Sequence, residues 1–227
     1  AQTPIATIAT EASSETNGNG DQLSWTATKT MDADDANGTV AFTIDYYDLA
    51  GNQGTQATAV LSGGNVTYDR TDPSANSIVV ASSNSNSSNY AMNGDVVSVT
   101  INTSEDLQSN AGLSPYGISS ATIAGQAISA GNISAISSTQ WKVSYTMDGD
   151  ESDGATGYAF TMADEAGNTA TVTSAGSNVV IDNTAPTLSA VTIASNNTND
   201  AYAKVGDVIT LSITSTEDLT AAPTVFL

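Results

Sequence analysis

The sequence predicts an all-β protein built from tandem β-sandwich domains, and three observations lead to this prediction. Apolar residues alternate with small or polar ones over short stretches, as at Val97, Val99 and Ile101, which is typical of strands with one buried face. No stretch carries a helical period with caps. The same motifs return after about 112 to 118 residues, which is the length of a domain rather than of a short solenoid unit.

The repeat is carried by pairs of motifs that recur in the same order. Trp25 and Trp141 each begin a stretch that ends in Thr-Met-Asp, and an Asp-x-Ala-Gly-Asn motif begins at Asp48 and again at Asp164. Further pairs of matching stretches are 6–9 with 121–124, 93–101 with 205–213, and 104–107 with 216–219. Because the matches extend over a whole domain length, they indicate tandem domains.

The frame of the repeat divides the chain into three parts. Residues 1–70 carry the second part of a repeat, residues 71–182 carry a complete repeat, and residues 183–227 carry the first part of another. Two explanations remain open. Either the sequence is a segment of a longer array, or each chain completes its broken domain with the fragment of a neighbouring copy.

The complete repeat contains the strands of one sandwich in order. Its alternating or continuously apolar stretches lie at 78–80, 97–101, 141–147, 158–162 and 179–181. A tight hairpin is predicted at Gly125 and Gln126, between Ile123 and Ile128. With about seven strands in about 112 residues, the pattern is that of an immunoglobulin-like sandwich without the Cys pair.

The Asp-x-Ala-Gly-Asn motif is interpreted as part of the last hairpin of a sandwich, and the Asp-rich stretch after it as the linker to the next sandwich. Gly51 and Gly167 can adopt a positive φ, and the Asn after each can fold its side chain onto the turn. A structural role is therefore favoured over a catalytic one. The two linkers are residues 69–73 and 182–186.

The charge of the chain is one-sided. There are 24 acidic residues and 4 basic ones, so the formal net charge is −20 at pH 7, although charged residues make up only 12% of the chain. A nucleic-acid partner is not expected, because a polyanion needs clustered Lys and Arg. Cations are the natural counterpart of such a surface.

The chain has no Cys and no His, which removes the usual zinc and haem sites, thiol nucleophiles and any Ser-His-Asp triad. No apolar run approaches the roughly 20 residues of a membrane-spanning helix, and the N-terminus lacks the layout of a signal peptide. The sequence therefore looks like a mature product or an excerpt from a longer chain. Its polar surface of Ser, Thr, Asn and Gly favours an extracellular location, either secreted or at the cell surface.

The order of these motifs resembles the bacterial Ig-like tandem repeats of large cell-surface proteins. The motifs that carry the resemblance are Asp-x-Thr-Ala-Pro at 182–186, the Gly-Asp strand at 94–101, Glu105-Asp106-Leu107, Trp141 and the motif that begins at Asp164. The resemblance implies a module of an adhesin stalk or of an S-layer-type array. Residues 182–186 also resemble the calcium-binding linker of cadherins.

Acidic residues are predicted to gather where one sandwich meets the next. At each junction, loops of the preceding domain, the linker and loops of the following domain converge. At the first junction the converging residues are Asp32, Asp34, Asp35, Asp69, Asp72, Glu105, Asp106 and Asp164. At the second junction they are Asp148, Asp150, Asp153, Asp182, Glu217 and Asp218.

Clustered carboxylates without His or Cys suit Ca²⁺, so we expect calcium at the junctions to join successive domains into a stiff rod. The alternative is that these residues form Asx turns and loop tips for backbone reasons. Residues 32–38 and 148–154 also resemble the start of an EF-hand loop. That similarity fails in detail, because the Gly falls one position late and position twelve is Thr43 or Ala159 rather than Glu, so a solvated acidic turn is favoured there.

The function expected is that of a structural module of a repetitive extracellular protein, an S-layer or filament building block or an adhesin extender, whose partners are other copies or neighbouring repeats. The alternative is a ligand-binding adhesin module that recognises carbohydrate (a surface glycan), ice or a host surface. Trp25 and Trp141 are expected in the core rather than as sugar platforms. An enzyme is not expected, because carboxylates that recur at equivalent positions of successive repeats suit a scaffold better than a single active site.

Overall fold

The computed structural model describes residues 3–18, 20, 23–109 and 117–226. In these residues the chain is all-β with several sheets, as the alternating pattern predicts, and it has one short 3₁₀ helix, η1 (Ala130–Asn132). No helix in the described part is long and apolar enough to cross a membrane. The chain divides into two compact units. The first comprises Ala1–Ser74, Thr103–Ile118 and Thr161–Ala170, and the second comprises Ala75–Asn102, Ser119–Phe160 and Thr171–Leu227.

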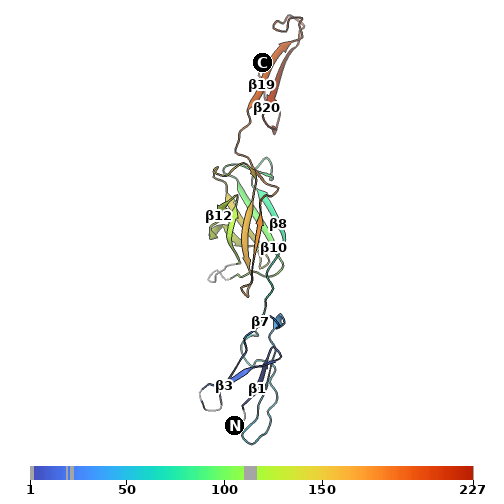
Figure 1. Cartoon of the computed structure of the whole chain (residues 1–227). Coiled ribbons are helices and arrows are strands. Elements are labelled where there is room, and N and C mark those ends of the chain that lie inside the picture. The colour runs from blue at the N-terminus through green and yellow to red at the C-terminus, as the bar shows by residue number, and fades with distance from the viewer. Residues whose placement is uncertain (1–2, 19, 21–22, 110–116, 227) are drawn as a thin grey trace. The chain divides into compact units, whose positions relative to one another are not determined.

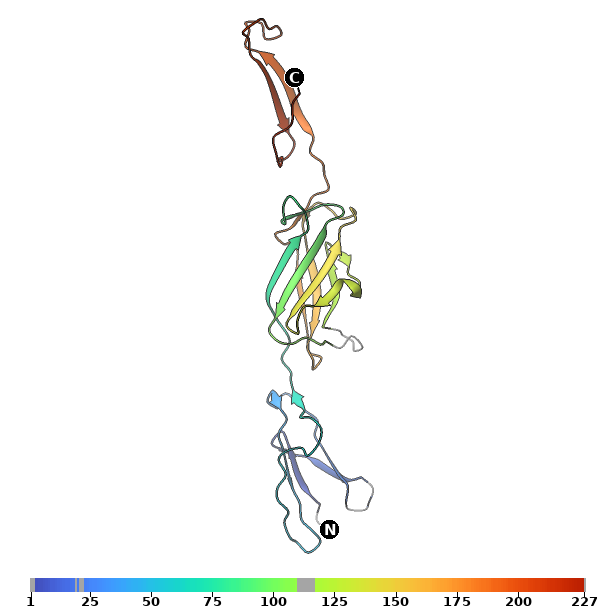
Figure 2. The same cartoon turned by 180° about the vertical axis from the view of Figure 1, so that it is seen from behind.

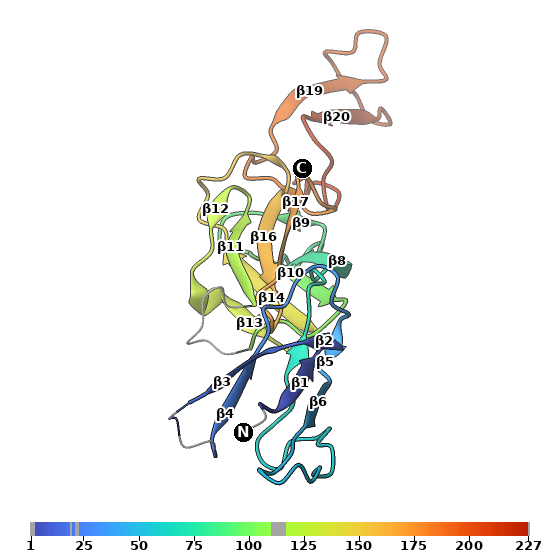
Figure 3. The ribbon, with the colours of Figure 1, turned by 60° about the horizontal axis from the view of Figure 1, so that its bottom comes forward.

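The N-terminal segment of the first unit contains seven short strands. They are β1 (Ile5–Ile8), β2 (Glu11–Ala12), β3 (Ser14–Asn17), β4 (Trp25–Thr28), β5 (Gly38–Thr39), β6 (Phe42–Asp45) and β7 (Thr67–Tyr68). They form a sheet of order β2-β1-β6 and two strand pairs, β3-β4 and β5-β7. Figure 3 shows β1 beside β6, where Ile8 lies opposite Phe42. The sheets of this segment are therefore small.

The strands that follow form two four-stranded sheets of order β13-β14-β10-β8 and β12-β11-β16-β17, and a small sheet of order β15-β18-β9 (Figure 1). Their bounds are β8 (Ala75–Ser82), β9 (Tyr90–Ala91), β10 (Val96–Thr103), β11 (Ile118–Ile123), β12 (Gln126–Ala127), β13 (Ile133–Ala135), β14 (Gln140–Thr146), β15 (Gly154–Ala155), β16 (Tyr158–Ala163), β17 (Thr169–Ser174) and β18 (Val180–Ile181). This is the sheet arrangement expected of a β-sandwich.

The core of the second unit comes from the alternating strands that the sequence indicates. Val97, Val99 and Ile101 of β10 are at most 1% exposed, and the residues between them are partly exposed. Trp141 of β14 lies opposite Ile101 in the antiparallel pairing of the two strands and is fully buried. The expectation that Trp141 is a core residue is therefore confirmed, whereas Trp25 is only half-buried.

The last two strands, β19 (Leu188–Ser195) and β20 (Ile209–Ser215), pair with each other in antiparallel fashion and form a two-stranded sheet (Figure 2). Their apolar side chains remain open to solvent. Val191 is 54% exposed and Ile193 is 67% exposed. An isolated two-stranded hairpin buries little of its surface, which distinguishes this element from the larger sheets before it.

The repeat of the sequence is reproduced in the backbone. Ala9 and Thr10 adopt φ values of 52° and 70°, and the equivalent Ala124 and Gly125 adopt 53° and 79°. Each pair forms the two-residue turn of a hairpin, β1–β2 or β11–β12. The hairpin predicted near Gly125 therefore exists, but its turn residues lie one position earlier than expected. Thr10 occupies the left-handed region, where the other repeat has Gly. This conformation is unfavourable for a β-branched residue.

A second equivalence links the C-terminal hairpin to strands β8 and β10. The side-chain amide of Asn84 donates to Asp95 Oδ2 at 2.7 Å, and that of Asn197 donates to Asp207 Oδ2 at 2.8 Å. The same carboxylate oxygens accept main-chain N–H groups three residues upstream. By this match β19 and β20 are the counterparts of β8 and β10, respectively.

Candidate metal centre

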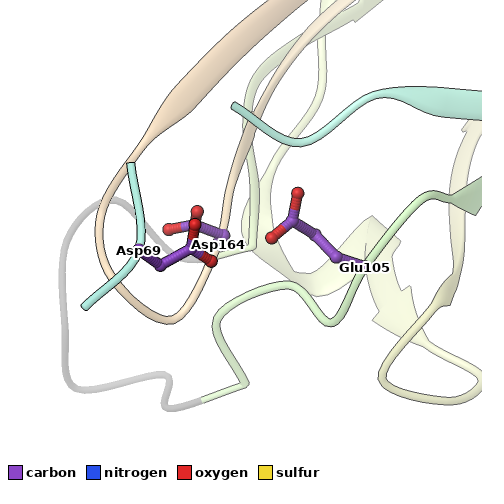
Figure 4. Close-up of side chains that lie close together, drawn as sticks. All are labelled: Asp69, Glu105 and Asp164. Carbon is purple, nitrogen blue, oxygen red and sulfur yellow. The ribbon is translucent and has the colours of Figure 1, made fainter. Parts of the chain in front are cut away.

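Three carboxylates of the first unit gather at one place, those of Asp69, Glu105 and Asp164. Each offers one oxygen, and the three oxygens lie within 4.8 Å of one another. Figure 4 shows the Glu105 carboxylate directed toward those of Asp69 and Asp164. In the part of the chain that the structure describes, this is the one group of three or more acidic side chains with such spacing.

Different segments supply the three residues. Asp69 follows β7 and opens the linker, Glu105 lies just after β10, and Asp164 follows β16. The loop after β10 is tied to the end of β16 because Leu107 forms an isolated antiparallel bridge with Asp164. The main-chain N–H of Gln108 also donates to the oxygen of Ala163 at 2.9 Å. These bonds bring Glu105 toward Asp164 although 59 residues separate them in sequence.

Asp164 is 1% exposed, and its carboxylate is held by its own turn. Its Oδ1 accepts the main-chain N–H groups of Gly167 (2.7 Å) and Asn168 (2.8 Å), and its Oδ2 accepts the Asn168 side-chain amide at 2.7 Å. Asp48 is held by Asn52 in the same way. The structural interpretation of the Asp-x-Ala-Gly-Asn motif thus matches its hydrogen bonds, and the aspartate is oriented without any ion.

The same turn also holds the linker. Asn168 Nδ2 donates to the main-chain oxygen of Asp69 at 3.1 Å. The Asp69 carboxylate accepts the main-chain N–H of Thr71 at 2.9 Å through Oδ1. This bond between Asn168 and Asp69 could not be predicted from the sequence, because the two residues are 99 positions apart.

The electrostatics of the group are unfavourable in the absence of a cation. Burial of Glu105, followed by the negative charges of Asp69 and Asp164, raises the pKa of this carboxyl above its usual value. Asp72 contributes in the same direction. The ion pairs found among the described residues are both made by Lys29, with Glu11 and Asp35, and neither involves these carboxylates. A bound cation would reduce the repulsion among these carboxylates, which neither ion pair offsets.

The spacing suits a calcium-sized ion. Ca²⁺ lies about 2.3–2.6 Å from its ligands, so two ligands on opposite sides of it are at most about 4.6–5.2 Å apart. Carboxylate oxygens within 4.8 Å of one another therefore fit one coordination sphere. Three carboxylates alone do not fill the six to eight positions of Ca²⁺, so main-chain oxygens or water would complete the shell.

The other residues predicted for the first junction are placed differently. Asp32 and Asp34 belong to a turn in which Asp32 Oδ1 accepts the main-chain N–H of Asp34 at 2.9 Å. That turn contacts the linker region through its main chain, because the Tyr68 hydroxyl donates to the oxygen of Asp32 at 2.7 Å. Asp72 acts on Glu105 through its charge. Among the described residues, Asp32, Asp34, Asp72 and Asp106 are not part of the group of three carboxylates.

The second junction has no such group in the described part of the chain. Asp148 accepts the main-chain N–H of Asp150 at 3.2 Å, and Asp182 accepts that of Thr184 at 3.1 Å. By the repeat, Asp182 and Glu217 correspond to Asp69 and Glu105, and Asp218 to Asp106. The counterpart of Asp164 would come 59 residues after Glu217, which lies past residue 227.

Both linkers are held by one kind of side-chain clasp. In the first, Asn37 accepts the main-chain N–H of Arg70 and donates to Thr71 Oγ1 at 2.6 Å. In the second, Asp153 accepts the main-chain N–H of Asn183 at 2.8 Å and the hydroxyl of Thr184 at 2.6 Å. The contact of Asn37 with the linker was not predicted from the sequence. Its signal is the Thr that follows the linker Asp by two positions in both repeats.

Comparison with protein-family models, with curated proteins and with solved structures finds no match to this chain. The internal repeat and the carboxylate group are therefore the features of the chain that bear on its function.

Proposed function

We propose that this chain is a structural module of a repetitive extracellular cell-surface protein, built from tandem immunoglobulin-like domains whose linkers are stiffened by Ca²⁺. The observation that carries the proposal is the group formed by Asp69, Glu105 and Asp164. One of its carboxylates belongs to the linker, and the other two belong to loops of the repeat that follows. An ion bound there would tie the linker to that repeat.

The clasps support a mechanical role. Each linker is bonded through its main chain to a side chain of the repeat before it, Asn37 or Asp153. The first linker is also bonded to the repeat after it through Asn168. A linker held on both sides loses conformational freedom, which is what a stiff connection between domains requires. The same polar clasp recurs in both repeats, as expected of a scaffold.

Calcium affinity is tested by measuring the melting temperature of the 227-residue chain in chelator and at increasing Ca²⁺. A ligand that binds only the folded state stabilises it by RT ln(1 + [L]/Kd), so an excess of about 100 Kd adds about 2.7 kcal/mol. We expect the melting temperature to rise with Ca²⁺ and to respond less to Mg²⁺, which requires shorter distances and a stricter octahedral geometry.

The matched variants are Glu105→Gln and Glu217→Gln. The first removes a charge from the group of three carboxylates, and the second changes the equivalent residue of the next repeat, where no such group occurs among the described residues. The calcium-dependent gain should fall in Glu105→Gln and persist in Glu217→Gln. If calcium leaves the melting temperature of the parent chain unchanged, the calcium part of the proposal is wrong.

A further inference from the structure

Lys29 contacts two acidic side chains of the N-terminal segment. Its ammonium nitrogen is 2.5 Å from Asp35 Oδ1 and 3.1 Å from Glu11 Oε2. The side chains of Lys29 and Asp35 are only 6% and 2% exposed, whereas that of Glu11 is 55% exposed. Lys and Asp are almost never buried to this extent unless they are paired. An amine and a carboxyl group are therefore held in contact away from water.

Neighbouring elements of the N-terminal segment bring these three side chains together. Glu11 belongs to β2 and lies opposite Ile8 of β1, while Lys29 directly follows β4. Asp35 lies in the turn after Lys29, where its main-chain N–H donates to the oxygen of Asp32 at 3.3 Å. The arrangement is therefore local to this segment.

The second oxygen of the Asp35 carboxylate has a partner of its own. Asp35 Oδ2 accepts the main-chain N–H of Asp32 at 2.8 Å. This N–H points at the oxygen on which negative charge develops when a nucleophile adds to Asp35 Cγ. Glu11 is within hydrogen-bond reach of the Lys29 amine and can accept its proton. The three residues and one N–H thus supply a nucleophile, an electrophile, a base and an oxyanion donor.

We propose that Lys29 and Asp35 condense to an amide that cross-links the chain between Nζ and Cγ. A proton first passes from the ammonium group to Oδ1, so that both groups are neutral. The Nζ lone pair then attacks Cγ, while the Asp32 N–H stabilises the negative charge on Oδ2. Glu11 takes a second proton from the nitrogen and delivers it to the Oδ1 hydroxyl. The bond between Cγ and Oδ1 breaks, and Oδ1 leaves as water.

The step balances without any other reactant, since an ammonium group and a carboxylate give an amide and one water molecule. Contact between the two groups makes the reaction intramolecular, which favours it. The hydrogen bond to Asp35 raises the pKa of Lys29, and the hydrogen bond to Lys29 lowers the pKa of Asp35. Both shifts favour the charged pair over the neutral pair that reacts. We therefore expect the cross-link to form slowly after folding, with the ion pair as its reactant state.

The complete repeat carries different residues at the equivalent positions. The counterpart of Lys29 is Tyr145, that of Asp35 is Glu151, and that of Glu11 is Gln126. Burial and a hydrogen bond to Glu151 raise the pKa of Tyr145. A phenol and a carboxyl group do not form an amide, and the side chain of Gln126 is not a base. One chain should therefore carry one such cross-link, in the N-terminal segment.

The cross-link would fix the turn that contacts the first linker. The Tyr68 hydroxyl donates to the main-chain oxygen of Asp32 at 2.7 Å, and the Arg70 guanidinium donates to that of Ala33. Both acceptors lie between Lys29 and Asp35 in sequence, inside the covalent loop. The cross-link does not involve the three carboxylates proposed to bind Ca²⁺, so a chain that fails to bind Ca²⁺ leaves the inference intact.

Mass spectrometry of the intact 227-residue chain tests the proposal. The purified chain is kept in chelator at neutral pH, and samples are denatured and measured until the mass is constant. We expect the chain to become lighter by the mass of one water molecule. Fragmentation of a protease digest should then give one branched peptide, in which Nζ of Lys29 is joined to the side chain of Asp35.

Three variants separate this reaction from other losses of water. Lys29→Arg keeps the positive charge but lacks the amine and should retain its full mass. Lys142→Arg changes an exposed lysine of β14 in the same way and should lose water as the parent chain does. Glu11→Gln removes the base and should slow the loss at least about 100-fold.

Two results would overturn the cross-link. One is a parent chain that keeps its full mass and gives no branched peptide. The other is a loss of water that persists in Lys29→Arg, which would place the reaction elsewhere in the chain. Loss of water from Glu11→Gln at the parent rate would overturn the role of Glu11 as the base. The melting temperature in Ca²⁺ is measured separately, so failure of the calcium proposal and failure of the cross-link are distinguishable.

Discussion

Asn168 Nδ2 donates a hydrogen bond to the main-chain oxygen of Asp69, 3.1 Å away, and the same amide donates to the Asp164 carboxylate at 2.7 Å. One side chain therefore holds both the turn that orients Asp164 and the linker that carries Asp69. The positions of two members of the carboxylate group depend on this residue.

Asn168→Ala should loosen the linker. It removes both side-chain hydrogen bonds of a partly buried amide, each worth about 1 kcal/mol. We expect faster hydrogen exchange of the amides in residues 69–74. Asn52→Ala is the control, since Asn52 has the same bond to Asp48 in the earlier turn, and it should leave exchange at 69–74 unchanged. Equal exchange in the Asn168 variant and the parent would show that the linker is held by other contacts.

Glu105→Gln should raise the melting temperature in chelator. The substitution keeps the shape of the side chain but removes one of three negative charges that repel one another. Added NaCl screens this repulsion, so the advantage of the variant should shrink at high salt. A melting temperature equal to or below that of the parent chain at low salt would contradict the repulsion inferred from the raised pKa of Glu105.

The two clasps should respond differently to acid. The Thr184 hydroxyl, and after it the N–H of Asn183, lowers the pKa of Asp153 below its usual 3.8. A lowered pKa contributes stability above the unfolded value, and this stability is lost as pH falls through the folded value. The difference in stability between the parent and Thr184→Val should therefore decrease below about pH 3.8.

Thr71→Val provides the comparison for that measurement. In the first clasp the partner of the threonine is the amide of Asn37, which does not titrate. The difference in stability between the parent and Thr71→Val should change less over the same pH range. Urea unfolding at several pH values measures both differences, and parallel curves for the two variants would refute the role of the Asp153 charge.

Ile101→Ala and Ile213→Ala should have unequal effects although the residues are equivalent. Ile101 is fully buried, so its truncation should cost about 2–5 kcal/mol. Ile213 is only partly buried in the hairpin and should cost under about 1 kcal/mol when the chain is monomeric. Urea unfolding of dilute samples, followed by far-UV circular dichroism, measures both values.

The strands were predictable because their signal is local. In β10 every second residue is buried from Val97 to Thr103, so the pattern in the sequence identifies both the strand and its inward face. The two-residue strands, such as β9 and β15, are too short to show a period. They form because a neighbouring strand pairs with them, and their own residues do not predict that pairing.

The candidate site was only partly predictable for a similar reason. The repeat identifies which acidic residues lie near a linker, and Asp69, Glu105 and Asp164 are among the fourteen expected. It does not reveal which carboxylates come within reach of one another, because that depends on contacts between distant segments such as the bridge between Leu107 and Asp164. The repeat also does not show where different residues make the same kind of contact at equivalent positions. Lys29 contacts the buried Asp35, whereas Tyr145 at the equivalent position contacts the buried Glu151.

The pairing of β18 with β9 determines how the complete repeat responds to tension. These strands run parallel, with Val180 opposite Tyr90, and main-chain N–H groups of Val180 and Asp182 donate to Asn89 and Ala91 at 2.8 and 2.9 Å. Force applied along the chain pulls parallel neighbours from opposite ends, so the strands must slide past each other and strain these bonds together. Rupture in shear needs a larger force than bond-by-bond unzipping, so the parallel pairing of β18 with β9 favours resistance to a pull along the chain.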